Sequence, residues 1–102
     1  MIEHENQETI SKWADETFGR VKNPISSITR VNKEIAELLH ALETGNQDYN
    51  KLREELADIE IVLRRVATEF GCNLQEEVDR KMAINRQRKW KLDGSGHAQH
   101  ID

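Results

Sequence analysis

Several residue types are scarce in this chain of 102 residues, and each scarcity excludes a class of protein. The single cysteine, Cys72, excludes a disulfide within the chain and favours a buried structural thiol. No apolar run approaches the roughly 20 residues of a membrane-spanning helix. The first ten residues, MIEHENQETI, are polar and acidic, unlike a secretory signal. We therefore expect a soluble, cytoplasmic protein.

An excess of positive charge is also absent, because the formal net charge is −4. A protein that binds nucleic-acid polymers needs a basic surface, so we expect no such partner. A nucleotide substrate stays open, since a bound cation can bridge acidic ligands to phosphates. Hydrophobic residues make up 36% of the chain, which would give one copy a thin core, and we therefore expect a homo-oligomer.

The apolar residues that are present recur with helical spacing in four segments, at about 7–18, 27–43, 48–70 and 73–90. The only proline, Pro24, separates the first segment from the second, and Ser26 or Ser27 is a candidate cap for the second segment. No segment has sustained two-residue alternation, so we expect no sheet and an irregular tail over about 91–102. Short connections between long helices favour an all-α, antiparallel four-helix bundle-like protomer, with one domain over residues 1–102.

Two pairs of carboxylates stand at matching places on the second and third helical segments. Glu34 lies about 85° from the centre of its apolar stripe, and Glu37 lies about 60° further round. Glu55 lies about 65° from the centre of the next stripe, and Asp58 about another 60° beyond it in the same sense. If the two helices pack antiparallel, the four carboxylates can converge into one acidic cleft.

Converging carboxylates repel one another unless protons or a cation neutralise them. Oxygen ligands of this kind suit Mg²⁺ or Mn²⁺, and such an ion can hold phosphates and activate water. The alternative is a solvated helix face, since Lys33–Glu37 and Lys51–Glu55 have the spacing of ordinary ion pairs. The residues alone leave both interpretations open.

With both pairs in view, the chain resembles the MazG-like, all-α nucleoside triphosphate pyrophosphohydrolases. Their pattern is ExxE, a spacer, then ExxD. Here it reads EIAE, with Glu34 and Glu37, and ELAD, with Glu55 and Asp58, separated by 17 residues. The resemblance covers about residues 7–90.

The resemblance implies hydrolysis of a (deoxy)nucleoside triphosphate to the monophosphate and pyrophosphate, with a role in cleansing the nucleotide pool. It implies that the four carboxylates bind Mg²⁺, or Mn²⁺ in its place, and that one of them orients the attacking water. A homodimer or homotetramer is also implied. A phosphoribosyl-ATP-type pyrophosphohydrolase and a non-catalytic helical oligomerisation module are the alternatives.

The segment KMAINRQR in the fourth helical region is similar to the basic helix of the same family. The resemblance implies that Lys81 and Arg88 contact phosphates and that Asn85 contacts phosphate or sugar. These residues have the spacing of one helical stripe, and without the resemblance a solvated basic face is an equal interpretation. Trp13 is a candidate for stacking on the base, against the alternative of a core aromatic.

Three histidines carry less weight as site residues. His40 forms an ExxH with Glu37, but a di-iron site needs such a pair on two helices, and the third segment has none. His97 and His100 lie in the tail, where a mobile terminus is the simpler interpretation.

Overall fold

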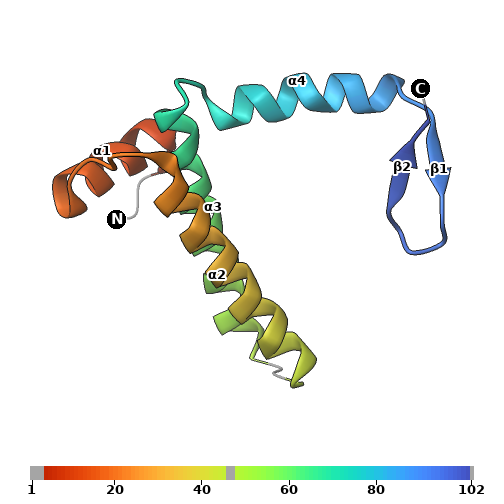
Figure 1. Ribbon diagram of the computed structural model, residues 1–102, viewed down its shortest axis with the longest axis horizontal. Coiled ribbons are helices and arrows are strands. Elements are labelled where there is room, and N and C mark those ends of the chain that lie inside the picture. The colour runs from red at the N-terminus through yellow and green to blue at the C-terminus, as the bar shows by residue number, and fades with distance from the viewer. Residues whose placement is uncertain (1–3, 46–47, 102) are drawn as a thin grey trace.

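The structure is a computed structural model that describes residues 4–45 and 48–101 (Figure 1). It confirms a chain built mainly from four helices. Within the described residues the elements, in order, are α1 (Gln7–Phe18), α2 (Pro24–Glu43), α3 (Tyr49–Glu69), α4 (Leu74–Gln87), β1 (Trp90–Leu92) and β2 (Ala98–His100). None of the helices in the described ranges is both long and apolar enough to cross a membrane.

Asparagine caps the N-terminus of α1, α2 and α4, and at α2 this cap lies earlier than the sequence analysis placed it. Helix α2 starts at Pro24, whose fixed backbone angle suits the first helical position. The Oδ1 atom of Asn23 accepts a hydrogen bond of 3.0 Å from the backbone N–H of Ile25 and so caps the helix. The prediction of a cap at Ser26 or Ser27 was wrong, because both serines lie within the first turn.

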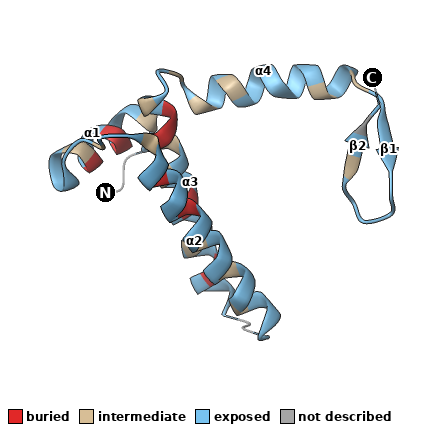
Figure 2. Cartoon of the chain, in the orientation of Figure 1, coloured by how far each residue is buried: buried red, intermediate tan, exposed pale blue. Residues whose placement is uncertain are grey.

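Helices α2 and α3 form an antiparallel pair, and α1 packs against α3 near one end of that pair (Figure 1). The buried apolar side chains lie on these three helices, mostly near the end where α1 joins (Figure 2). Among the described residues they are Ile10, Ala14, Val31, Leu52, Ile59, Val66 and Ala67. Each large one occupies a predicted apolar stripe, so the helical period identified the correct face of α1, α2 and α3.

Helix α4 leaves the other three helices and runs outward as an arm (Figure 1). None of its residues is buried, and the helix it chiefly contacts is α3. The Cα radius of gyration is 16.5 Å, against about 13 Å for a compact domain of this length. The four predicted helices are therefore present, but a single chain does not close them into one bundle.

The tail carries the clearest correction, because residues that we expected to be irregular form a two-stranded antiparallel sheet. Strand β1 pairs with β2 in the register Trp90↔His100, Lys91↔Gln99 and Leu92↔Ala98. The turn between them reads DGSG at residues 93–96, and both of its glycines have positive φ. Strands of three residues are too short to show alternation, so the turn was the available signal. The tail's last residue, Asp102, lies outside the described residues.

Candidate functional site

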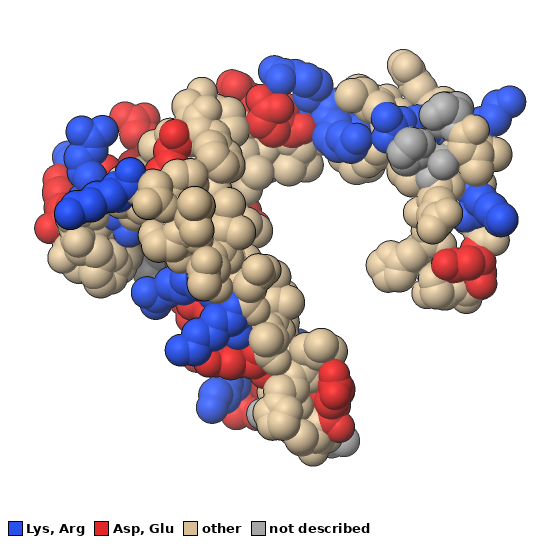
Figure 3. Space-filling model, viewed as in Figure 1, with Lys and Arg blue, Asp and Glu red and all other residues tan. Residues whose placement is uncertain are grey.

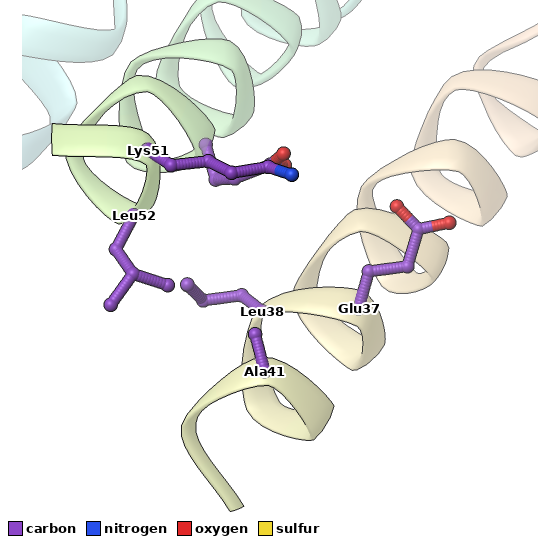
Figure 4. A pocket seen from close by; sticks show the side chains of 6 residues that line it. Glu37, Leu38, Ala41, Lys51 and Leu52 are labelled. Atoms are coloured by element: carbon purple, nitrogen blue, oxygen red, sulfur yellow. The ribbon is translucent and has the colours of Figure 1, made fainter. Parts of the chain in front are cut away.

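A cavity of about 200 Å³ lies between α2 and α3 near the connection that joins them (Figure 4). Its walls hold one carboxylate from each predicted pair, Glu37 from α2 and Glu55 from α3. Leu38 and Leu52 point toward each other across the gap, and Lys51 extends from α3 toward α2 (Figure 4). The cavity therefore combines two acidic groups and one ammonium group over an apolar contact.

Glu37 also lines a second, more open hollow of about 520 Å³ along α2, together with Glu34. The same wall carries Arg30, Lys33 and polar residues of the first turns of α2. Glu37 is thus the carboxylate that the two hollows share. A group in this position can reach a ligand in either hollow.

Glu34 is largely enclosed, since its side chain is only 16% exposed. Its Oε1 atom accepts a hydrogen bond of 3.4 Å from Nε of Arg30, one helical turn earlier. Its Oε2 atom is buried and has no hydrogen-bond partner. A buried carboxylate oxygen without a donor is unfavourable, and such groups are found where a ligand can satisfy them.

The two pairs do not meet in a single cluster. No three His, Cys, Asp or Glu side chains within residues 4–45 and 48–101 stand in an arrangement that could hold a metal ion. Asp58 is exposed and lines neither of these two hollows. Since like charges repel, carboxylates come together only where protons or a cation offset the repulsion.

The basic residues of the predicted site lie away from the carboxylates of the same chain. Lys81 is exposed on the α4 arm. Arg88 follows the last helical residue, so α4 ends earlier than the boundary near residue 90 that we expected. Other Lys and Arg side chains lie along the outer half of α4 and the strands beyond it, and further ones lie over α1 and the α2–α3 pair (Figure 3). Arg88 is half-buried in the single chain.

Asn85 belongs to the same region and is half-buried. Its backbone carbonyl accepts a hydrogen bond of 3.0 Å from Nε1 of Trp90, which ties the first strand to the end of α4. Its side-chain Oδ1 atom is buried and has no hydrogen-bond partner. This oxygen can accept a hydrogen bond from a sugar hydroxyl or a base.

Trp13 lies on α1, is 55% exposed and lines neither hollow. Its ring meets that of Phe18 edge to face, with centroids 5.3 Å apart. Neither ring belongs to the buried core, so the core interpretation of Trp13 fails within a single chain.

Lys51 is the cavity residue that the sequence analysis did not assign to the site. Its spacing from Glu55 was read as that of a solvated ion pair, and the sequence gives no sign that the side chain turns toward α2. The signal that was present is its place one turn before an ExxD pair on the same helix.

Comparison with known proteins agrees with this fold. The chain is 36% identical over 97 residues to a dATP/dGTP diphosphohydrolase of Salmonella phage PMBT28, and it spans 30% of that longer protein. It is 31% identical over 80 residues to a dATP/dGTP diphosphohydrolase of Cyanophage S-2L, and these residues are 78% of this chain and 70% of the relative. No family model matches the sequence.

A solved structure of a related protein has the same fold. It is described as the Cyanophage S-2L MazG-like pyrophosphohydrolase bound to dGDP and three catalytic Mn²⁺ ions per active site. The TM-score is 0.74 at 29% identity, and the match covers 94% of this chain and 93% of that chain. The four helices therefore match the all-α fold of a nucleotide pyrophosphohydrolase. Within that class, the chain belongs to the MazG-like pyrophosphohydrolases.

Proposed function

We propose that this protein hydrolyses purine deoxynucleoside triphosphates, dATP and dGTP, to the monophosphate and pyrophosphate with the help of Mg²⁺ or Mn²⁺. The observation that carries the proposal is the cavity between α2 and α3, which holds Glu37, Glu55 and Lys51. The purine and deoxyribose preference is supported by the names of the two phage relatives. Removal of such triphosphates would cleanse the nucleotide pool.

The oxygen chemistry of the donor set suits a hard divalent cation, although the four side chains do not come together within the described residues of one chain. All four acidic residues offer carboxylate oxygens, and the unpartnered Oε2 of Glu34 is available to a ligand. Glu34, Glu37, Glu55 and Asp58 would hold the metal, as the family resemblance implies. When bound, the cation would offset the charge of the phosphates and stabilise the negative charge that develops during hydrolysis.

The chain's own residues have separate tasks in this proposal. Lys51 binds phosphate oxygens from the α3 side of the cavity. Glu37, which lines both hollows, orients a water molecule and accepts its proton as the water oxygen attacks the α-phosphorus. The bond between that phosphorus and the bridging oxygen breaks, and pyrophosphate leaves. The monophosphate keeps the oxygen that came from water.

The same proposal includes assembly of the chain with further copies of itself. Large apolar side chains on α2 and α3 stay exposed, although they lie on the stripes that the helical period predicts. Those exposed on these two helices include Ile28, Ile35, Leu39, Leu42, Leu56 and Leu63. Covering them in a homodimer or homotetramer would supply the burial that a single chain lacks. Such an assembly would also let Lys81, Asn85 and Arg88 approach carboxylates of another copy.

The test is a panel of the four dNTPs, the four NTPs and phosphoribosyl-ATP, each with Mg²⁺ or Mn²⁺ and with pyrophosphate as the readout. We expect dATP and dGTP to be the best substrates, with turnover abolished in Glu37→Gln and Glu55→Gln. Glu43→Gln and Glu54→Gln are matched controls, because both residues are exposed on the same helices and line neither hollow. No turnover of any nucleotide would contradict the proposal, and preference for phosphoribosyl-ATP would replace it with the alternative.

A further inference from the structure

The direction of the α4 arm depends on a short connection between α3 and α4. Helix α3 ends in a left-handed glycine, Gly71, with φ of 72°. Two backbone hydrogen bonds close this end, from Gly71 N–H to the carbonyl of Thr68 and from Cys72 N–H to the carbonyl of Ala67. This is a Schellman motif, which stops the helix and turns the chain. Asn73 then caps α4. Only Cys72 therefore lies between Gly71, which ends α3, and the cap of α4.

One side chain from the opposite end of the sequence joins the two sides of this connection. The Nε2 group of Gln7 donates to the backbone carbonyl of Cys72 at 2.7 Å and to Oγ1 of Thr68 at 3.0 Å. Its Oε1 atom accepts a hydrogen bond of 2.7 Å from the backbone N–H of Leu74, the first residue of α4. Both ends of the Gln7 amide are therefore used. The Nε2 group satisfies the carbonyl of Cys72, and Oε1 satisfies the N–H of Leu74, which has no partner inside α4.

The position of Gln7 is itself fixed. It is the first residue of α1, directly after Asn6, which forms a capping box with Thr9. One turn later, Oγ of Ser11 lies 2.7 Å from Oγ1 of Thr68, which holds α1 against α3 beside the connection. The amide of Gln7 thus links α1 to the start of α4 from a position that is held by the contacts of α1.

Among the described residues, α4 contacts chiefly α3, and none of its own residues is buried. The path from Leu74 to Arg88 is about 21 Å at 1.5 Å per helical residue, so a rotation of about 10° at the connection would move its far end by roughly 4 Å. A displacement of that size is large against the fit that substrate positioning requires.

We infer that Gln7 is a positioning residue, which sets the direction of α4 and through it the approach of Lys81 and Asn85 to the substrate. The effect on activity rests on the proposed function, whereas the effect on α4 does not. Gln7 lines neither hollow that holds the predicted metal ligands; the hollow that it does line lies at the start of α4, beside the connection.

The test compares Gln7→Met, which keeps the length and loses every hydrogen bond, with Gln75→Met as the matched control. The Gln75 amide makes only an exposed bond of 2.9 Å to Asp79 within α4 among the hydrogen bonds described. In Gln7→Met we expect the Leu74 amide to exchange roughly tenfold faster. We also expect that the residual dipolar couplings of α4 no longer fit a single orientation relative to α3. The KM for dGTP should rise by a larger factor than kcat falls. Gln75→Met should match wild type in each measurement.

Gln7→Glu serves if Gln7→Met does not fold, because it keeps an acceptor for Leu74 N–H and loses the donor to the Cys72 carbonyl. It should loosen α4 to a smaller extent. Unchanged couplings and unchanged Leu74 exchange in a folded variant would overturn the inference. A loosened α4 in a protein whose wild type hydrolyses no nucleotide would support the positioning role and overturn the proposed function.

Discussion

Glu34 provides a prediction in which stability and activity change in opposite directions. Its carboxylate is 16% exposed, and one of its oxygens is buried without a hydrogen-bond partner. Replacing Glu34 by glutamine keeps the shape and removes the charge. We expect the metal-free Glu34→Gln protein to be more stable than wild type, because the buried carboxylate loses its charge. We also expect it to hydrolyse no dGTP, because the same charge is needed to bind the metal.

The magnitude follows from two contacts. A buried oxygen without a hydrogen-bond partner costs about 1–3 kcal/mol, and more when it carries charge, so the neutral amide avoids the charged part of that penalty. The i,i+4 contact with Arg30 at 3.4 Å is lost, and exposed pairs of this kind contribute about 0.3–0.5 kcal/mol. The net gain is about 1 kcal/mol, or about 4–8 °C in Tm for a chain of this size.

The assay is thermal unfolding followed by circular dichroism in EDTA, together with pyrophosphate release from dGTP. Glu37→Gln is the control, since Glu37 is exposed and its replacement should abolish turnover while changing stability by less than about 0.5 kcal/mol. A Tm of Glu34→Gln below that of wild type would refute the reasoning about the buried oxygen. Retained turnover in Glu34→Gln would refute its place among the metal ligands.

Three further predictions concern other parts of the chain. Asp58→Asn should lose turnover and keep its helical circular dichroism, and full activity would remove Asp58 from the site. Asn23→Ala should lower the free energy of unfolding by about 1 kcal/mol in urea titration, because the N–H of Ile25 loses its cap; an unchanged midpoint would contradict this. Hydrogen bonds from the side chain and then the backbone of Ser95 hold the pKa of Asp93 below its ordinary value. A depressed pKa stabilises the turn above the ordinary pKa and ceases to do so as pH falls through the folded value. Ser95→Ala should raise the pKa of Asp93 in carboxyl NMR titration, and an unchanged pKa would contradict the assigned cause.

The helices and their inner faces could be predicted because helical period depends on local sequence alone. Val31, Leu52 and Ile59 fall on the expected stripes and are buried. Glu37 and Glu55, one carboxylate from each predicted pair, share a cavity, as expected for neighbouring antiparallel helices, although the two pairs do not converge within the described residues. Both results follow from residue spacing on an antiparallel pair, which needs no knowledge of distant contacts.

The parts that could not be predicted depend on contacts between distant segments. The direction of α4 is set at a connection where Gln7 meets Leu74, a pairing that no local pattern shows. The short strands pair across a five-residue loop and lack the alternation that longer strands display. The turn of Lys51 toward α2 likewise depends on how two helices meet. Tertiary contact, and not local preference, decided these features.

Phosphorus NMR of dGTP with the protein and Mg²⁺, which is diamagnetic, tests the central claim most directly, because it identifies which phosphate bond breaks. We predict that pyrophosphate and dGMP appear in equal amounts, with neither orthophosphate nor dGDP, and that Glu37→Gln leaves dGTP intact. Release of orthophosphate in place of pyrophosphate, or an unchanged dGTP spectrum with the wild-type protein, would contradict the proposed hydrolysis.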